Sequence, residues 1–435
     1  MNKTEPRTLP GFMELFPNEQ VLFNKIKNTI IDTYKSYGFY PIDTPVIELS
    51  EVLLAKAGGE TEKQIYRFKK GENDLSLRFD LTVPLAKYVA KRCNELVFPF
   101  KRYQVGKVFR GERQQKGRFR EFYQCDIDVI GDEELSLKYD SEMVNVIYDI
   151  FNKLNIGEFI IRINNRKILG GFFESLDLSD KITDILRIVD KLEKIGNEEV
   201  KKELSSLEID NKNIEKIIEF INIKGSNEEI LSKLNNYTNN ETFNLGVVEL
   251  NEVISDLKMR NINTNNYKID LTIARGLDYY TGTVYETNLV KFPGIGSVCS
   301  GGRYENLAEF YTDRKLPGVG VSIGLTRLFS QLLEENIISI DESSSSDVMI
   351  VPMCDNYDYV YKVKEILMNA GKSVNVCFID KGFKQKMKYA NRMNNKYIII
   401  IGEDEVNKNI VSLKNMIDGT QIEVDLKSLE NIDLK

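Results

Sequence analysis

Histidine is absent from all 435 residues of this chain. Its absence excludes a Ser-His-Asp triad, a general base built on imidazole, and any metal site that needs histidine ligands. The side chains that remain for chemistry are mainly arginines and carboxylates. Arginine is permanently charged and offers a planar fork of donors that fits phosphate, so an arginine-rich site would suit phosphate chemistry governed by positioning and charge stabilisation.

Cysteine is also scarce. The five cysteines are scattered, odd in number and without a CxxC pair: Cys93, Cys125, Cys299, Cys354 and Cys377. This spacing argues against a disulfide framework and against a structural zinc site. It fits a reducing compartment.

The chain has no uncharged apolar run long enough to cross a bilayer, and its first residues, MNKTEPRTLPGF, lack an apolar signal core. We therefore expect a cytoplasmic protein with no membrane partner. The formal net charge is -7. Any surface for nucleic acid must then be a local basic patch on an acidic body.

Composition divides the chain into segments. Two β-rich blocks, about 75–130 and 268–327, flank a region of helical periodicity rich in lysine, glutamate and asparagine, about 166–262. The run DESSSS, residues 341–346, has the composition of a linker. Beyond it, VMIVP, SVNVCFI and YIIII alternate with helical stretches 356–370 and 383–395, which predicts a compact α/β domain over residues 347–435.

A polar strand stands out in the first β-rich block. EFYQCDIDVI, residues 121–130, alternates with period two, so Phe122, Gln124, Asp126 and Asp128 share one face. That face can be buried only if its carboxylates are paired or bind a ligand. KRYQVGKVFR, residues 101–110, predicts the partner strand of a hairpin with a basic loop at its tip. An ordinary solvated hairpin with surface charges remains the alternative.

Five motifs resemble one enzyme family. FRGERQQKGRFREFYQCDID, LPGVGVSIGLTRL and GFYPIDTPVIE resemble the second, third and first signature motifs of class II aminoacyl-tRNA synthetases. LRFDLTVPLAKY and ARGLDYYTGTVYE resemble the histidine-specific signatures of histidyl-tRNA synthetases, and IIIIGEDEV and VSLKN resemble the anticodon-binding domain of that family.

The resemblance implies an α+β fold. An antiparallel-sheet catalytic domain of class II type would span residues 1–340 and carry the helical insertion, and an α/β anticodon-binding domain would follow the linker. It also implies a homodimer, because the first motif packs at the subunit interface in the family. The implied activity is that of a histidine–tRNA ligase, which converts ATP and L-histidine to histidyl-adenylate and pyrophosphate and then transfers histidine to the 3′ end of histidine tRNA, with Mg²⁺ accompanying ATP.

Roles in ATP binding follow by resemblance. Arg110 would hold the α-phosphate, Arg275 would bridge the α-phosphate and the substrate carboxylate, and Arg327 would lie over the adenine and reach the γ-phosphate. These three arginines are the predicted catalytic residues. The complete set of predicted ATP-binding residues is Arg110, Glu112, Arg118, Phe122, Arg275 and Arg327. We predict no resident metal ion.

Recognition of histidine needs groups that satisfy both imidazole nitrogens and the ammonium. By resemblance, the predicted histidine-binding residues are Asp80, Leu81, Thr82, Arg110, Gln124, Asp128, Arg275, Tyr279 and Tyr280. Many bacterial relatives carry glutamate at the positions of Asp80 and Asp128.

Two regions are predicted to bind tRNA. Arg113 and Gln115 lie in the loop that reads the extra guanosine of histidine tRNA in the family. Lys384, Lys388 and Arg392 recur every four residues in a stretch without acidic residues, so they share one helical face that could contact the anticodon stem. A solvated helix surface is the alternative for these three side chains.

A second function class also fits the resemblance. A catalytically silent paralogue serves as the histidine-binding regulatory subunit of ATP phosphoribosyltransferase. That paralogue generally lacks the tail domain and loses motif arginines, whereas this chain keeps Arg110, Arg275, Arg327 and residues 347–435. Other nucleotide motifs do not fit: no GxxxxGK[ST] loop occurs, and Gly318, Gly320 and Gly324 miss the dinucleotide fingerprint by one spacing.

Overall fold

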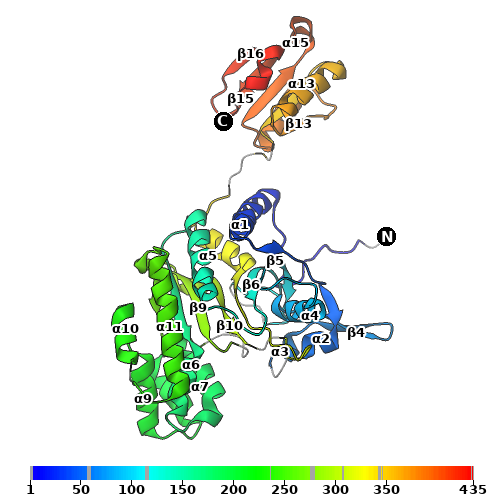
Figure 1. Cartoon of the computed structure of the whole chain (residues 1–435). Coiled ribbons are helices and arrows are strands. Elements are labelled where there is room, and N and C mark those ends of the chain that lie inside the picture. Colours follow the sequence, from blue (N-terminus) through cyan, green and yellow to red (C-terminus); the bar gives the residue numbers. More distant parts are fainter. Residues whose placement is uncertain are drawn as a thin grey trace. The chain divides into compact units, whose positions relative to one another are not determined.

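The computed structural model describes residues 3–55, 60–112, 117–235, 237–274, 280–305, 308–340, 344, 346–432 and 434. The chain forms two compact units (Figure 1). The first comprises Met1–Glu14 and Ile26–Ile338, and the second comprises Leu15–Lys25 and Ser339–Lys435.

An eight-stranded sheet forms the centre of the first unit. The order of its strands is β1-β5-β6-β11-β10-β9-β7-β8. Both edge strands, β1 and β8, pair in parallel with their neighbours, and all the pairs between them are antiparallel. In sheet order the strands are Tyr40–Pro41, Phe100–Phe109, Glu121–Ile130, Gly318–Gly324, Cys299–Tyr304, Thr283–Leu289, Phe159–Asn165 and Tyr267–Ile269. The predicted α+β fold with a largely antiparallel sheet is confirmed.

The hairpin β5–β6 agrees with its prediction. β6 covers 121–130 as predicted, and its register with β5 runs from Phe100 opposite Ile130 to Phe109 opposite Glu121. Both faces of β6 are buried from Cys125 onward, since Cys125 and Ile127 are inaccessible and Asp126 and Asp128 are only 3% and 5% exposed. The alternative of a solvated hairpin is therefore wrong for these two carboxylates.

The segment before this hairpin contributes to two sheets. The stretch 39–48, which is strand-like in sequence but contains Pro41 and Pro45, divides between β1 and a three-stranded sheet of order β2-β4-β3. Pro45 lies between the two parts and has no N–H with which to continue a ladder. The strands of the small sheet are β2 Ile47–Leu49, β3 Arg67–Lys70 and β4 Asn73–Leu77, and the helices outside the insertion are α1 Pro17–Ser36, α2 Ser50–Leu54, α3 Glu60–Gln64, α4 Thr82–Arg92, α5 Lys138–Leu154 and α12 Leu325–Glu334.

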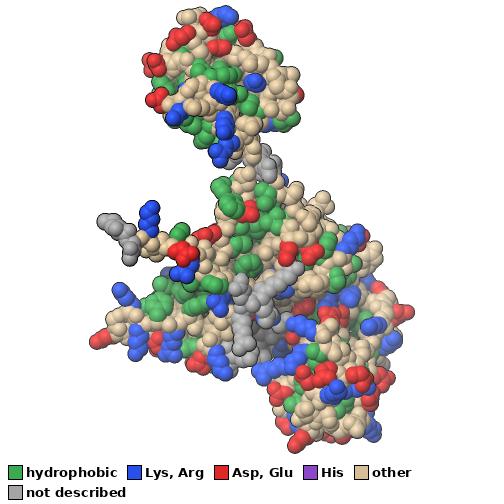
Figure 2. Space-filling model, turned by 180° about the vertical axis from the view of Figure 1, so that it is seen from behind, with side chains coloured by type: hydrophobic (Ala, Val, Ile, Leu, Met, Phe, Trp, Pro, Cys, Tyr) green, Lys and Arg blue, Asp and Glu red, His purple; other side chains and the backbone are tan. Residues whose placement is uncertain are grey.

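A set of helices connects β7 to β8, within the region predicted to be a helical insertion. They are α6 Arg166–Glu174, α7 Ile182–Val189, α8 Leu192–Ser205, α9 Asn211–Ile221, α10 Asn227–Leu234 and α11 Glu241–Met259. Aromatic rings fill their core, where Phe172 stacks on Phe220 with 4.0 Å between ring centroids. Charged side chains of both signs are interspersed over the outer surface of these helices (Figure 2).

Helices α6 and α11 approach each other closely at two glycines. A Cβ atom at Gly171 would lie 2.3 Å from the backbone nitrogen of Phe243, and one at Gly246 would lie 2.7 Å from that of Ile168. Only glycine allows the two backbones to come this near. The contact fixes α11 against the helix that leaves the end of β7.

The second unit contains a five-stranded sheet of order β13-β12-β14-β15-β16. The first three strands are parallel and the last two antiparallel. Its elements are β12 Val348–Pro352, α13 Tyr357–Asn369, β13 Val374–Val376, α14 Phe383–Arg392, β14 Tyr397–Ile401, α15 Glu403–Lys408, β15 Ile410–Asn415 and β16 Gln421–Asp425. The predicted helix 383–395 ends early, and Asn394 follows it in a left-handed conformation with φ of 53°.

Two findings concern the chain as a whole. All five cysteines are free thiols. Within the described ranges, none of the helices combines the length and the apolar composition needed to span a bilayer.

The glycine contact between α6 and α11 yields a matched pair of variants. We expect Gly171→Ala to destabilise the protein by about 1–3 kcal/mol, because the new methyl group forces the two backbones apart. Gly170 is the adjacent residue of the same helix, and a Cβ there meets nothing within 4 Å. Gly170→Ala should therefore stabilise by up to about 1 kcal/mol through helix propensity. Urea unfolding of both variants measures the difference, and equal shifts would contradict the proposed contact.

Candidate active site

A cavity of about 530 Å³ lies in the first unit. Residues of β6, β9, β10 and β11 line it, together with segments that follow β4, β5 and β11 in the chain. Its lining residues are Gln64, Asp80, Thr82, Arg110, Glu112, Gly117, Arg118, Phe119, Phe122, Gln124, Asp126, Tyr280, Tyr285, Glu286, Ser297, Val298, Cys299, Ser300, Gly301, Ser322, Gly324 and Arg327.

The structure brings many of the predicted site residues together in this lining. They are Asp80, Thr82, Arg110, Glu112, Arg118, Phe122, Gln124, Tyr280 and Arg327. Two predicted residues, Leu81 and Asp128, are buried but do not belong to the lining. The predictions for Arg113, Gln115, Arg275 and Tyr279 lie outside the described residues.

Two aromatic rings contact the Arg110 guanidinium. Its central carbon lies 4.4 Å from the ring centroid of Phe79 and 5.0 Å from that of Phe122. Its Nε also donates to the carbonyl oxygen of Phe79 at 3.3 Å. Cation–π contact orients the charge without neutralising it, so Arg110 can still face an anion.

Two more arginines lie near the tip of the β5–β6 hairpin. Arg118 forms an ion pair with Glu112 at 3.1 Å. Arg327, in the first turn of α12, donates from Nη2 to the carbonyl oxygen of Ile295 at 2.6 Å. Together with Arg110 they make this part of the cavity suitable for a polyanion such as a triphosphate.

Buried carboxyl groups gather further along β6. Arg102, opposite Asp128 in the hairpin register, is 0% exposed and pairs with the Asp128 carboxylate. Asp80 and Asp126 also interact electrostatically with Arg102. Arg110 also interacts with Asp80, and the buried Arg78 with Asp126, so these three carboxyl groups share Arg102 with two further arginines.

Burial raises the pKa of each of these carboxyl groups. Arg102 opposes the rise for Asp126 and Asp128, whereas the hydrogen bond from the Val83 backbone and the charge of Arg110 oppose it more strongly for Asp80. The pKa of Asp126 is raised to about 7 and that of Asp128 to about 6. Neighbouring carboxylates add to the rise for both groups. The cluster can thus gain or lose a proton near neutral pH, and a cation in the cavity would favour its ionised form.

Two acceptors in this part of the cavity are unsatisfied. Gln124 donates from Nε2 to the Ser322 hydroxyl at 2.8 Å, which orients its amide. Within the part of the chain that the structure describes, Gln124 Oε1 and Asp126 Oδ1 are buried without a hydrogen-bond partner. Buried acceptors left unpaired are costly, so these two atoms are suited to donors brought by a ligand.

The remaining predicted acids have defined partners. Asp128 accepts a hydrogen bond from the Tyr304 hydroxyl at 3.0 Å. A Cβ at Gly320 would lie only 2.2 Å from Asp128 Oδ1, so this glycine makes room for the carboxylate. Asp80 accepts from the backbone nitrogens of Thr82 and Val83 at 3.1 and 2.9 Å, which fixes it at the start of α4.

Sequence reasoning missed Arg102, Ser322 and Glu286 and did not assign Asp126 to the site. The period-two pattern already placed Asp126 between Gln124 and Asp128, so that signal was present. Arg102 could have been found from the hairpin register, which sets it opposite Asp128. Ser322 and Glu286 lie within the motifs LPGVGVSIGLTRL and ARGLDYYTGTVYE, so the motifs marked their neighbourhood but not their individual roles.

The predicted tRNA residues of the second unit lie on α14. Lys384, Lys388 and Arg392 are exposed, and their spacing of four places them on one face of that helix. In the view of Figure 2, acidic side chains of this unit gather towards one end and most of its basic side chains towards the other. Electrostatic attraction to an anionic partner would thus be local.

Models of two families match the chain. The model described as histidyl-tRNA synthetase matches residues 11–328, and the model described as anticodon binding domain matches residues 347–433.

Relatives and solved structures match over nearly the whole chain. The histidine–tRNA ligase of Clostridium tetani is 55% identical over 97% of each chain, and that of Finegoldia magna is 47% identical over 98% of each. The crystal structure of histidyl-tRNA synthetase from Nostoc sp. PCC 7120 covers 99% of both chains with a TM-score of 0.90 and 43% identity. An ATP phosphoribosyltransferase regulatory subunit/histidyl-tRNA synthetase from Bacillus halodurans is similar in fold, with a TM-score of 0.74, 16% identity and coverage of 89% of this chain and 97% of the other.

The raised pKa of Asp126 predicts a pH dependence of stability. A carboxyl group whose pKa is higher in the folded than in the unfolded state loses stabilising free energy as pH rises from its ordinary pKa to its folded value, here about 7. We therefore expect the Tm of the wild type to fall over this range relative to that of Asp126→Asn, with no further divergence above it. Asp313→Asn, at an exposed position, controls for the loss of a carboxylate. Parallel Tm curves for wild type and Asp126→Asn would contradict the buried titration.

Proposed function

Because the chain belongs to the histidyl-tRNA synthetase family and attaches histidine to tRNA, we propose that the cavity holds ATP and histidine during the first step of that reaction. In this step the carboxylate of histidine attacks the α-phosphate of ATP, forming histidyl-adenylate and releasing pyrophosphate. In the second step the terminal adenosine of the tRNA takes the histidyl group.

The observation that carries this proposal is the reversal of charge along β6. Arginines gather where Phe122 lines the cavity, and buried acids surround Asp126 four residues further along. At the rise of an extended strand these two positions are about 13 Å apart. A triphosphate suits the first position and the ammonium of an amino acid suits the second. The α-phosphate of ATP and the carboxylate of histidine would then meet between the two positions.

The first step brings two anions together, and cations must offset their repulsion. We assign Arg110 to the α-phosphate, because the rings of Phe79 and Phe122 hold it in one orientation. Arg327 is assigned to the γ-phosphate and Arg275 to the bridge between α-phosphate and substrate carboxylate. Glu112, held by Arg118, would accept from the adenine amino group, and Phe122 would stack on the base.

Histidine would be held by the acceptors at the acidic part of the cavity. Gln124 Oε1 and Asp126 Oδ1 can accept from its ammonium or imidazole N–H groups, and Asp80, Thr82 and Tyr280 border the same space. We propose that the positive ammonium draws Asp126 into its ionised form, since an adjacent cation lowers the pKa of a carboxyl group. Asp128 and Leu81, which are buried outside the cavity lining, would support the acidic part of the cavity. Tyr279 keeps its proposed role in contacting the imidazole.

The second unit and the hairpin loop would bind the tRNA. We assign Arg113 and Gln115 to the extra guanosine at the start of histidine tRNA. Lys384, Lys388 and Arg392 would contact phosphates of the anticodon stem, where cations supply position and affinity without reading sequence.

A homodimer is supported by the inverted pattern of β2. Its apolar Ile47 and Leu49 are 48% and 43% exposed, whereas Glu48 between them is buried in an ion pair with Lys87. Tyr40 of the edge strand β1 is 70% exposed. We propose that a second copy of the chain covers these apolar side chains, and the mass of the particle in sedimentation checks this.

We propose that Mg²⁺ enters with the phosphates of ATP. In the described ranges no group of three or more cysteine and acidic side chains is arranged to hold a metal ion, and we assign no step to one. The cytoplasm, where ATP and tRNA occur, is the proposed location. A regulatory subunit is less well supported, because its relative in Bacillus halodurans shares the fold alone.

Arg275→Lys tests the assignment of the bridging arginine. We expect histidine-dependent pyrophosphate exchange to fall about 10²- to 10³-fold, because a single ammonium cannot contact two oxyanions as a planar fork does. The affinity for histidine, measured by calorimetry, should change much less. Exchange at nearly the wild-type rate would refute the role of Arg275.

Replacing Lys384, Lys388 and Arg392 together by Ala tests the role of α14. We expect weaker binding of histidine tRNA and a shallower salt dependence, with the slope reduced by about 0.7–0.9 for each phosphate that the variant no longer neutralises. Pyrophosphate exchange should not change. The matched control removes three exposed lysines elsewhere in the second unit, Lys362, Lys408 and Lys427. If both triple variants weaken binding equally, α14 has no special role.

A further inference from the structure

The order of the strands places the connection between β8 and β9 at one end of β7. β7 lies between these two strands, parallel to β8 and antiparallel to β9. A chain that leaves β8 and enters β9 must therefore cross the carboxyl end of β7. That connection, residues 270–282, carries Arg275.

Side chains at the end of β7 hold the described residues just before Arg275. Asn164 donates from Nδ2 to the carbonyl oxygen of Ile273 at 2.9 Å, and Arg166 donates from Nη2 to that of Ala274 at 3.1 Å. The backbone N–H of Arg166 also donates to the carbonyl oxygen of Gly282 at 2.9 Å. The strand end thus contacts the connection both before and after Arg275.

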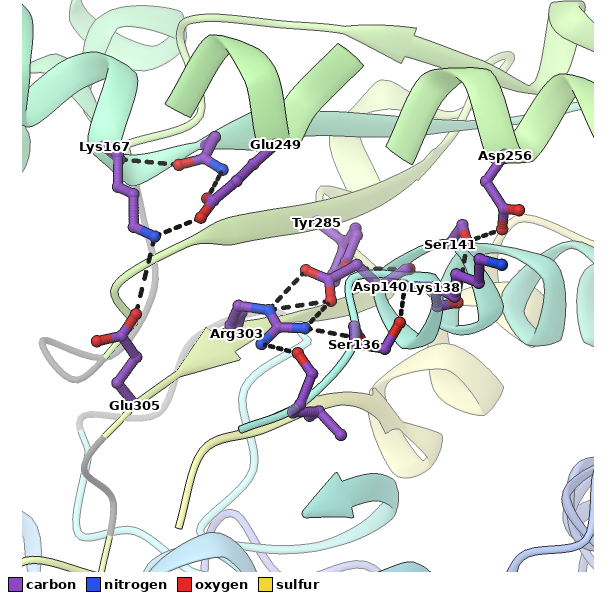
Figure 3. Close-up of polar contacts among 12 residues, drawn as sticks. Ser136, Lys138, Asp140, Ser141, Lys167, Glu249, Asp256, Tyr285, Arg303 and Glu305 are labelled. Carbon is purple, nitrogen blue, oxygen red and sulfur yellow. Dashed lines mark hydrogen bonds and ion pairs between the residues drawn. The ribbon is translucent and has the colours of Figure 1, made fainter. Parts of the chain in front are cut away.

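Asn165 and Lys167, the other two residues of the run Asn164–Lys167, contact Glu249 of the helical insertion instead. Asn165 donates from Nδ2 to one carboxylate oxygen of Glu249 at 2.8 Å, and Lys167 pairs with the other. Figure 3 shows Lys167 directed between Glu249 of α11 and Glu305, which follows β10. In the run Asn164–Lys167, alternate side chains therefore contact the connection and the insertion.

Arg303 holds the end of the connection that leads into β9. Its carbonyl oxygen accepts from the backbone nitrogen of Thr281 at 2.9 Å. Its guanidinium forms an ion pair with Asp140 at 2.6 Å and donates to the carbonyl oxygens of Leu135 and Ser136 (Figure 3). Because Arg303 is buried and paired, Thr281 is attached to a rigid support.

We propose that Asn164 is a positioning residue for adenylate formation, which fixes the backbone at Ile273 so that Arg275 is presented to the reacting groups, and that Glu249 of the insertion orients the strand end from which Asn164 acts. This inference rests on the proposed role of Arg275. It gives the helical insertion a part in the first step of the reaction, before any tRNA is bound.

The burial of these groups supports a precise role. Asn164, Asn165 and Ile273 are almost inaccessible, at 0%, 0% and 2% exposure. A buried amide donor on a buried carbonyl fixes both partners, because either group left unpaired would cost free energy. Arg275 comes two residues after the acceptor, so a displaced Ile273 would displace the start of the catalytic segment.

Asn164→Ala tests the proposal against a control whose side chain binds the other end of β7. We expect kcat for pyrophosphate exchange to fall about 10- to 100-fold, since a displacement of about 1 Å can cost 10²-fold in rate. The KM values for ATP and histidine should change little. Asn266 donates from Nδ2 to the carbonyl oxygen of Phe159, at the other end of β7, at 3.0 Å. Asn266→Ala removes a bond of the same kind and should leave kcat unchanged, so equal kcat in the two variants would overturn the proposal.

An Arg275→Ala background shows whether Asn164 acts through Arg275. If it does, Asn164→Ala should cause no further loss of kcat in that background. A full additional loss would mean that Asn164 acts in another way. If Arg275→Ala alone left exchange intact, the proposed function of Arg275 would fail instead, so the two failures are distinguishable. Unfolding of each variant, measured by circular dichroism, separates an effect on stability from an effect on positioning.

Glu249→Gln tests the contribution of the insertion. The amide removes the charge that pairs with Lys167, and we expect a smaller fall in kcat than for Asn164→Ala, again with little change in KM. Glu252 is exposed on the same helix, and Glu252→Gln is its control. Equal kcat for the two glutamine variants would overturn the part assigned to Glu249.

Discussion

The buried guanidinium of Arg102 is the constraint on which the acidic part of the cavity depends. Without it, Asp126 and Asp128 would lose their main cation, and an unpaired buried charge costs several kcal/mol. Burial raises the pKa values of Asp126 and Asp128, and Arg102 opposes the rise only in part. A positively charged group in the cavity would therefore favour the ionised form of these carboxyl groups. The ammonium of a bound amino acid would be such a group.

Much of the site could be predicted from local patterns. Strand β6 has its predicted bounds, and residues as distant as Asp80 and Arg327 meet in one cavity. Those predictions succeeded because period two fixes a face and because the motifs keep their order along the chain. The role of Arg102 was not predicted, since a charged residue in a strand is ordinarily exposed and only the hairpin register reveals its partner. The division of residues 39–48 between two sheets likewise depended on tertiary pairing, not on local propensity.

The contacts at the end of β7 show a second limit of sequence reasoning. Asn164 and Arg166 bind carbonyl oxygens more than one hundred residues away, as their separations of 109 and 108 residues show. A backbone carbonyl has no side-chain signature, so nothing in the sequence marks Ile273 or Ala274 as a partner. The insertion could be recognised as helical from its periodicity. Its attachment to the catalytic sheet appears only when Glu249 is seen between Asn165 and Lys167.

The walls of the cavity contain no imidazole, because the chain contains no histidine. In a complex with its substrate, every imidazole resonance in a magnetic resonance spectrum would therefore belong to the ligand. A histidine substrate labelled in its ring would therefore report the protonation of the bound imidazole without interference from protein histidines. The imidazole of the bound substrate can thus be observed in a protein that contains no other imidazole group.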